Sequence, residues 1–197
     1  MRILFQGDSI TDCGRDREDK HSLAGYTALV ADILGKEHEY FNRGISGDTS
    51  KMVLDRYEKD IKALTPDIMT LLIGINDVWR FHDSNLYTSP KMYYENVEKI
   101  LVETKKDFPN VKIIMIEPFL LPSPDRLPWR RECIEFIDAC RDLAVKYADG
   151  FIPIDGLFAK ECLTTPWQEL SYDGVHPAKK GNELIAKYLS DEIKRFL

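Results

Sequence analysis

Short apolar runs alternate along the chain with segments in which apolar residues recur every three or four positions. The two clearest runs cover residues 67–73 and 111–118, where apolar side chains follow one another with few interruptions. Continuous runs of this length are typical of parallel strands that are covered on both faces of a sheet. Three shorter runs are also predicted to be strands, at residues 2–6, 39–42 and 150–154.

Helical spacing of apolar residues fills the intervals between these runs. The segments in helical register are residues 23–33, 48–63, 94–108, 130–148 and a last segment that begins near Pro177. An alternation of strands and helices implies a parallel sheet with helices on both faces. Residues 118–129 contain several prolines and are predicted to form a long loop. Because no repeat or break in composition divides the chain, we expect one domain over residues 1–197.

Charge and cysteine content narrow the class of protein. The 197 residues carry a formal net charge of -6 and no basic cluster longer than a pair, so nucleic-acid binding is not expected. No apolar run approaches the roughly 20 residues that span a bilayer, and the N-terminal run is too short for a signal peptide. The four cysteines include no C-x-x-C pair, which argues against a zinc or dithiol site. We therefore expect a cytoplasmic protein without a bound metal or a membrane partner.

Polar and glycine-containing segments follow the ends of the predicted strands. In open parallel sheets, ligands bind beyond the carboxyl ends of the strands. The candidate residues that the chain places there are Ser9, Gly44, Asn76, Asp173 and His176. Among the four histidines, His176 follows a carboxylate by three residues within the glycine-containing turn "DGVH", so Asp173 can accept its Nδ1–H and leave Nε2 facing a serine.

Acyl transfer is the chemistry that this set of residues favours. It needs an activated hydroxyl, a base held in one tautomer, and donors for the developing oxyanion. Ser9 can supply the hydroxyl, while the backbone N–H groups of Ser9 and Gly44 and the side-chain amide of Asn76 can supply the donors. Taken singly, Ser9 can be a capping or turn residue, Asn76 a turn residue and His176 a surface histidine, so the prediction rests on their combination.

The same segments resemble the four motif blocks of the GDSL/SGNH hydrolase family. The string "GDSI" is similar to the first block, "GISGDTS" to the second, "GIND" to the third, and the D-x-x-H of "DGVHP" to the last. The resemblance implies a flavodoxin-like, three-layer α/β/α sandwich with a five-stranded parallel sheet. It also implies ester hydrolysis through an acyl-serine without a metal or other cofactor.

By the same resemblance, Ser9 is the nucleophile, His176 the general base and Asp173 the residue that orients it. The resemblance likewise assigns the oxyanion hole to Ser9, Gly44 and Asn76. The longer strings "GDSITDCGR" and "GINDVWR" resemble the intracellular acetylxylan esterases, which remove acetyl groups from xylo-oligosaccharides. The small-molecule substrate expected from this resemblance is an acetylated sugar.

Two other functions stay open at this point. One is a lysophospholipase or thioesterase, for which the apolar loop "FLLPSPDRLPW" can line a trough for a long acyl chain. The other is a non-catalytic carbohydrate-binding protein with the same fold.

Four residues near the motif blocks are candidates for substrate contact. Trp79 and Tyr172 can stack on a sugar ring, or they can pack in the core or at a subunit contact. Arg80 can face the acyl pocket or form a structural ion pair, and Asp8 can contact substrate, orient the nucleophile turn or cap the next helix. Exposed aromatic residues in the string "WRFHDSNLY" leave a homo-oligomer open.

Overall fold

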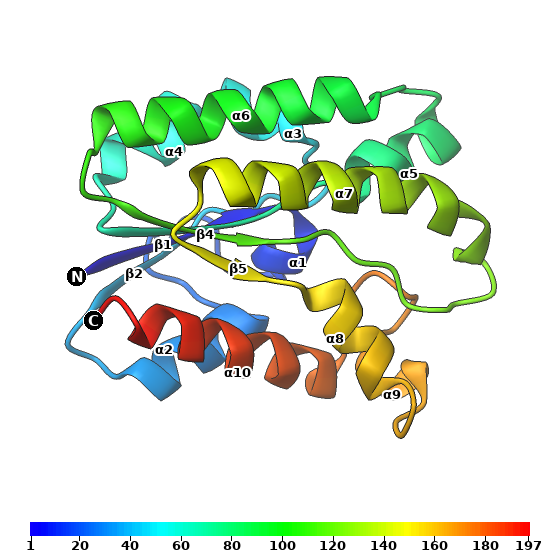
Figure 1. Ribbon diagram of the computed structural model, residues 1–197. Helices are drawn as coiled ribbons and strands as arrows, with labels where there is room; N and C mark the ends of the chain where they lie inside the picture. Colours follow the sequence, from blue (N-terminus) through cyan, green and yellow to red (C-terminus); the bar gives the residue numbers. More distant parts are fainter.

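A five-stranded sheet lies at the centre of the protein, and all of its strands run parallel (Figure 1). The computed structural model describes residues 1–197. The strand order is β2-β1-β3-β4-β5. The strands are β1 (Arg2–Gly7), β2 (Glu39–Asn42), β3 (Ile68–Leu72), β4 (Lys112–Ile116) and β5 (Gly150–Ile152). All five predicted strands are therefore present, within one or two residues of the expected bounds.

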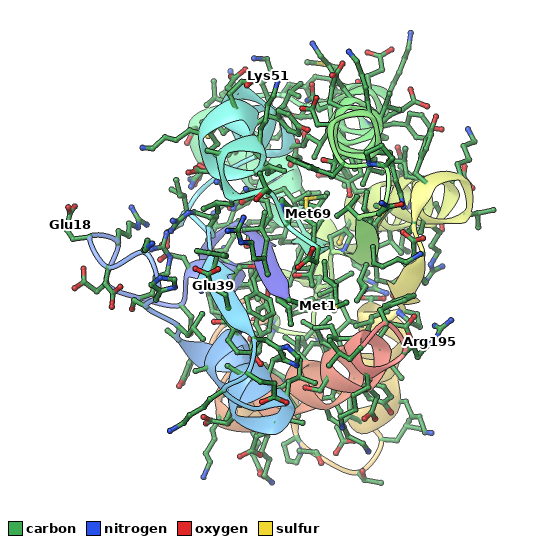
Figure 2. The ribbon with its side chains drawn as sticks, turned by 90° about the vertical axis from the view of Figure 1, so that its left-hand side faces the viewer. Met1, Glu18, Glu39, Lys51, Met69 and Arg195 are labelled. Atoms are coloured by element: carbon green, nitrogen blue, oxygen red, sulfur yellow. The ribbon has the colours of Figure 1, made fainter.

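Helices cover both faces of this sheet, so the protein has three layers (Figures 1 and 2). One layer contains α3 (Ser50–Asp55), α4 (Tyr57–Asp60), α6 (Pro90–Asp107) and α7 (Arg130–Tyr147). The opposite layer contains α2 (Gly25–Leu34) and α10 (Lys179–Lys194), which pack against each other. The predicted three-layer α/β/α arrangement is confirmed. No helix of the protein is both long enough and apolar enough to cross a membrane.

Four further helices follow strand ends or lie near them. They are α1 (Ser9–Asp12), α5 (Ile75–Ser84), α8 (Ile154–Glu161) and α9 (Trp167–Leu170). Helices α1 and α5 begin within three residues of the carboxyl ends of β1 and β3. The first turns of these two helices are therefore held directly by the centre of the sheet.

The central strands are apolar because they are covered on both sides. Every residue of β3 is buried, and so are all residues of β1 after Arg2. Burial of both faces removes these side chains from water and gives the sheet a fixed position between the helical layers. That rigid centre is what positions the loops at the carboxyl edge.

The largest differences from the predicted helices are a break within residues 48–63 and an earlier start of α6, which begins at Pro90 and not at residue 94. The helix expected over residues 48–63 is broken into α3, α4 and a short 3-10 turn, with Arg56 outside helical geometry at φ -104° and ψ 15°. The Arg56 guanidinium bonds to Asp48, Asp60 and the Gly7 carbonyl oxygen, so the break is tied to the end of β1. The last helix begins at Lys179, because Pro177 pairs with Ser171 in an isolated bridge.

Candidate active site

Ser9 is presented by a tight turn at the carboxyl end of β1. Gly7 ends the strand, and a Cβ at this position would lie 2.3 Å from Thr11 Oγ1 and 2.5 Å from the Leu72 carbonyl oxygen. The Asp8 carboxylate caps α1 by accepting a hydrogen bond of 3.0 Å from the Ile10 N–H. The Ser9 hydroxyl oxygen then lies 2.9 Å from Nε2 of His176.

His176 is held by Asp173 within the turn that precedes α10. Nδ1 of His176 lies 2.9 Å from Oδ2 of Asp173, and the other carboxylate oxygen accepts the backbone N–H groups of Val175 and His176. This arrangement fixes the tautomer in which Nδ1 carries the proton and Nε2 accepts from Ser9. The serine, histidine and aspartate thus form one continuous hydrogen-bonded series.

Hydrogen bonds also control the charges of this pair. The hydrogen bond to Asp173 raises the pKa of His176, and this effect outweighs burial, which lowers it. Burial acts to raise the pKa of Asp173, but the hydrogen bonds from His176 and Val175 outweigh it and hold that pKa below its usual range. The carboxylate therefore remains ionised across the range in which the imidazole titrates.

Two residues that the sequence did not single out position the turn that carries His176. The Ser171 hydroxyl donates to the His176 carbonyl oxygen at 2.8 Å and accepts the Gly174 N–H at 2.9 Å. Gly174 has φ +93°, and a Cβ there would lie 2.7 Å from Cβ of Ser123. Its carbonyl oxygen accepts the Leu121 N–H at 2.8 Å, so residues 118–129 pack against the turn.

The structure corrects the predicted role of Gly44. Its N–H donates to Oδ1 of Asn42 at 2.9 Å and is therefore not free for an oxyanion. A Cβ on Gly44 would lie 2.3 Å from the backbone nitrogen of Asp12, so this glycine allows two chain segments to touch. Asn42 holds the contact by donating also to the Thr11 carbonyl oxygen.

Gly47, the second glycine of "GISGDTS", lies beside Ser9, where the prediction placed Gly44 as a backbone donor. Gly47 lines the same pocket as Ser9, Asn76 and His176. Its backbone has φ +90°, and its N–H donates to no group of the protein. Asn76 lies in the first turn of α5 and donates one amide hydrogen to the Asp48 carbonyl oxygen at 3.0 Å. Its second amide hydrogen remains available to a ligand.

Two buried carboxylates lie next to Ser9 and Asn76 in the chain. Asp8 is completely buried, and burial raises its pKa to about 7. Asp77 accepts from the N–H and the hydroxyl of Ser50, and burial raises its pKa to about 6. Asp8 has no access to solvent, so the prediction that it contacts substrate is wrong and its capping role remains.

The pocket beside Ser9 is small and polar. Its volume is about 270 Å³, and Trp79 is its single hydrophobic lining residue. The lining residues are Ser9, Ser46, Gly47, Asn76, Trp79, Arg80, Asp83 and His176. The ring centroids of Trp79 and His176 are 5.8 Å apart.

The other two candidate contact residues differ in their placement. Arg80 lines the pocket and pairs with Asp83 at 2.5 Å. Tyr172 is 76% exposed and does not line the pocket. The backbone N–H of Tyr172 donates to the His176 carbonyl oxygen, which places this exposed residue next to the turn that carries His176, and its contact with substrate stays a prediction.

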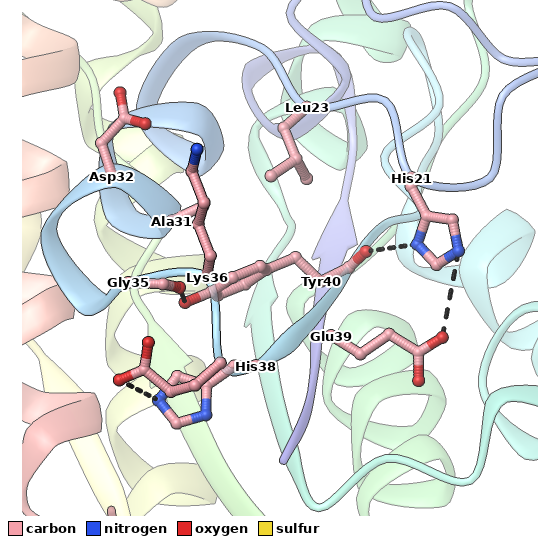
Figure 3. A pocket seen from close by; sticks show the side chains of 10 residues that line it. His21, Leu23, Ala31, Asp32, Gly35, Lys36, His38, Glu39 and Tyr40 are labelled. Atoms are coloured by element: carbon pink, nitrogen blue, oxygen red, sulfur yellow. Dashed lines mark hydrogen bonds and ion pairs between the residues drawn. The ribbon is translucent and has the colours of Figure 1, made fainter.

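A larger hollow of about 550 Å³ lies elsewhere, over α2 and β2 (Figure 3). Its two histidines face carboxylates, with His21 3.9 Å from Glu39 and His38 3.8 Å from Glu37. None of the predicted site residues lines it. No group of three or more His, Cys, Asp or Glu side chains in the protein is arranged to hold a metal ion.

A serine, a histidine and an aspartate that are hydrogen-bonded in series at the carboxyl edge of a parallel sheet are the arrangement that serine hydrolases use. The sequence matches the GDSL-like lipase/acylhydrolase family over residues 5–184, and the chain belongs to that family. The predicted family and the predicted class of carboxylic ester hydrolase are both confirmed.

Similar proteins include an acetylxylan esterase from Geobacillus stearothermophilus. It is 32% identical over 207 residues, which cover 98% of this chain and 93% of the relative. Its crystal structure superposes with a TM-score of 0.86 at 31% identity, covering 98% and 93% of the two chains. An arylesterase from Vibrio mimicus is 26% identical over all of this chain and 90% of the relative. These likenesses confirm the fold class.

Proposed function

We propose that the protein is a serine esterase that removes acetyl groups from sugars such as acetylated xylo-oligosaccharides. The observation that carries this proposal is the series of 2.9 Å contacts from Ser9 to His176 and from His176 to Asp173, opening into a small polar pocket. The cytoplasmic location and the single domain over residues 1–197 expected from composition belong to the same proposal.

The first half of the reaction forms an acetyl-serine. Nε2 of His176 takes the proton of Ser9, whose oxygen attacks the ester carbonyl carbon. The N–H groups of Ser9 and Gly47 and the free amide hydrogen of Asn76 donate to the oxyanion. Asp173 holds the imidazolium that forms. His176 then gives its proton to the departing sugar oxygen as the carbon–oxygen bond breaks.

The second half releases acetate. A water molecule attacks the acetyl-serine while His176 takes one of its protons, and the same donors stabilise the second oxyanion. Collapse of this intermediate returns the proton to Ser9 and frees the acid. The complete reaction consumes one ester and one water molecule and forms one alcohol and one acetic acid.

The pocket's size and lining favour acetate over a long acyl chain. A volume of about 270 Å³ with one hydrophobic lining residue offers no trough for an alkyl chain. Leu120 and Leu121 of the proline-rich loop line a separate hollow of about 260 Å³ that includes none of Ser9, Asn76 and His176. The lysophospholipase or thioesterase alternative is therefore less well supported.

The sugar part of the proposal rests on two observations. The relative from Geobacillus stearothermophilus carries the name acetylxylan esterase. Trp79 places an indole ring in a polar pocket beside His176, and aromatic faces of this kind can pack against the apolar face of a sugar ring. The intact hydrogen-bonded series argues against a purely carbohydrate-binding role.

Initial rates on p-nitrophenyl esters of acetate, butanoate and octanoate test the acyl preference, and acetate release from acetylated xylo-oligosaccharides tests the sugar. We expect kcat/KM to fall steeply beyond the acetyl ester. Equal or faster hydrolysis of the octanoyl ester would overturn the acetylesterase assignment.

A further inference from the structure

Arg126 carries a guanidinium that no acceptor of the protein satisfies. Its central carbon lies 3.9 Å from the centroid of the Trp79 ring and 4.5 Å from that of Trp129. No hydrogen bond or ion pair within the protein reaches the side chain, and its Nε is buried without a partner. An arginine held by two indoles keeps its charge and its in-plane N–H groups.

The two indoles belong to a longer stack that ends at the catalytic histidine. Trp129 stacks on His82 at a centroid distance of 4.6 Å and an interplanar angle of 10°. Nε2 of His82 lies 2.7 Å from a carboxylate oxygen of Glu132. At the other end, Trp79 lies between Trp129 and His176, at 5.4 and 5.8 Å. Only the Trp79 side chain therefore separates Arg126 from His176.

The backbone that carries Arg126 is also fixed relative to His176. The Arg126 N–H donates to the Ser123 carbonyl oxygen at 3.0 Å. Ser123 packs against Gly174 and the neighbouring Leu121 N–H bonds to Gly174, inside the turn of the catalytic histidine. The guanidinium is thus held in place before a ligand binds. Binding therefore costs little conformational entropy of the loop that carries Arg126.

The position of Arg126 determines which half of an ester it can meet. His176 gives its proton to the leaving alcohol, and Trp79, whose ring Arg126 covers, lines the pocket next to His176. Arg126 makes no contact with the proposed oxyanion donors Ser9, Gly47 and Asn76, so it is assigned to the alcohol and not to the acyl carbonyl. Free guanidinium N–H groups match the closely spaced oxygen atoms of polyhydroxylated compounds.

We propose that Arg126 is a specificity residue for the alcohol half of the ester. It donates hydrogen bonds to hydroxyl oxygen atoms of a polyhydroxylated alcohol, while Trp79 and Trp129 hold its plane. This inference rests on the proposed function and extends it to the group that recognises the leaving alcohol.

The test compares substrates that share the acetyl group and differ in the alcohol. Steady-state kinetics of wild type, Arg126→Met and Arg126→Lys are measured on p-nitrophenyl acetate, an acetylated xyloside and a glycerol acetate. In Arg126→Met, we expect kcat/KM to fall about tenfold more for the two polyhydroxylated esters than for p-nitrophenyl acetate, mainly through KM. Arg126→Lys keeps the charge without the planar fork and should recover part of that loss.

Arg131→Met is the matched control, because Arg131 is exposed on α7 and forms no ion pair or hydrogen bond. It should leave all three substrates unchanged. Equal losses on every substrate in Arg126→Met, together with a lower melting temperature, would show a purely structural role and overturn the proposal. No loss on any substrate would overturn it as well.

The glycerol ester separates this proposal from the proposed function. A wild-type enzyme that hydrolyses p-nitrophenyl and glycerol acetates but not the xyloside contradicts the sugar substrate. In that case, a selective loss on glycerol acetate still supports the role of Arg126, and an unselective loss overturns it.

Discussion

The hydroxyl oxygen of Ser9 lies 2.9 Å from Nε2 of His176, although 167 positions separate the two residues in the chain. The contact forms because β1 and the turn before α10 both end at the carboxyl edge of the sheet. A serine hydroxyl is a weak nucleophile unless an adjacent base accepts its proton. Activity should therefore follow the unprotonated fraction of His176.

The first prediction concerns pH. Because the bond to Asp173 raises the pKa of His176, the acidic limb of kcat/KM should lie above the usual histidine value of 6.5. Asp173→Asn removes that stabilisation of the cation, so the limb should move to lower pH, and kcat should fall by about 10⁴. A profile that stays flat down to about pH 4 in the wild type is incompatible with His176 as base.

The second prediction concerns the oxyanion donors. Replacing Asn76 by Ala removes a side-chain donor, and kcat should fall by about 10² to 10³ with little change in KM. Asn110→Ala is the matched control, since Asn110 is exposed and lies in the turn before β4. An Asn76→Ala enzyme with wild-type kcat would exclude the amide from the oxyanion site.

The third prediction concerns Asn42, which holds the Gly44 N–H in a structural contact. This side chain is fully buried and bonds to the Gly44 N–H, the Thr11 carbonyl oxygen and the Thr27 hydroxyl. Asn42→Ala leaves these groups unpaired, so urea denaturation should show a loss of about 2–4 kcal/mol in the free energy of unfolding. An unchanged unfolding midpoint would argue against the structural role assigned to this contact.

The fourth prediction concerns the turn that carries His176. Gly174→Ala adds a Cβ at φ +93° and 2.7 Å from Cβ of Ser123. The strain should lower the free energy of unfolding by about 1–3 kcal/mol, and displacement of His176 should lower kcat. Gly156→Ala in α8 meets no atom within 4 Å and serves as control, with activity retained. Equal behaviour of the two variants would contradict this packing.

The fifth prediction concerns the buried carboxyl of Asp8. Its pKa of about 7 in the folded protein lies above the ordinary value of 3.8, so the unfolded chain releases this proton first as pH rises. Its contribution to stability therefore falls between these two values. Asp8→Asn keeps the acceptor for Ile10 and lacks the proton, so its melting temperature relative to wild type should rise from pH 5 to pH 8. A difference independent of pH contradicts the raised pKa.

The strands could be predicted from the sequence because burial on both faces leaves a strong local pattern. Residues 68–72 and 112–116 lie inside the predicted runs, since a doubly covered strand must be apolar along most of its length. The break at Arg56 could not be predicted, because it depends on a hydrogen bond to Gly7, 49 positions away. The sequence does not predict helix α5, because Gly74 and the Asn-Asp pair that follows it are typical of a turn.

Ser9, Asn76, Asp173 and His176 could be singled out because each lies in a short motif after a predicted strand. The choice between Gly44 and Gly47 could not be made, because it depends on where the Asn42 side chain lies in space. Arg126 lies outside every motif. Its position depends on two tryptophans from different segments, which only the folded chain brings together.

The most direct test of Ser9 as nucleophile is to trap its acyl intermediate. Wild type and Ser9→Ala are mixed with p-nitrophenyl acetate, quenched in acid during turnover, digested and examined by mass spectrometry. One acetyl group should appear on the peptide that contains Ser9 in the wild type and be absent from Ser9→Ala, whose kcat should be lower by several orders of magnitude. Turnover by Ser9→Ala at the wild-type rate, or an acetyl group on a different residue of the wild type, would contradict the mechanism.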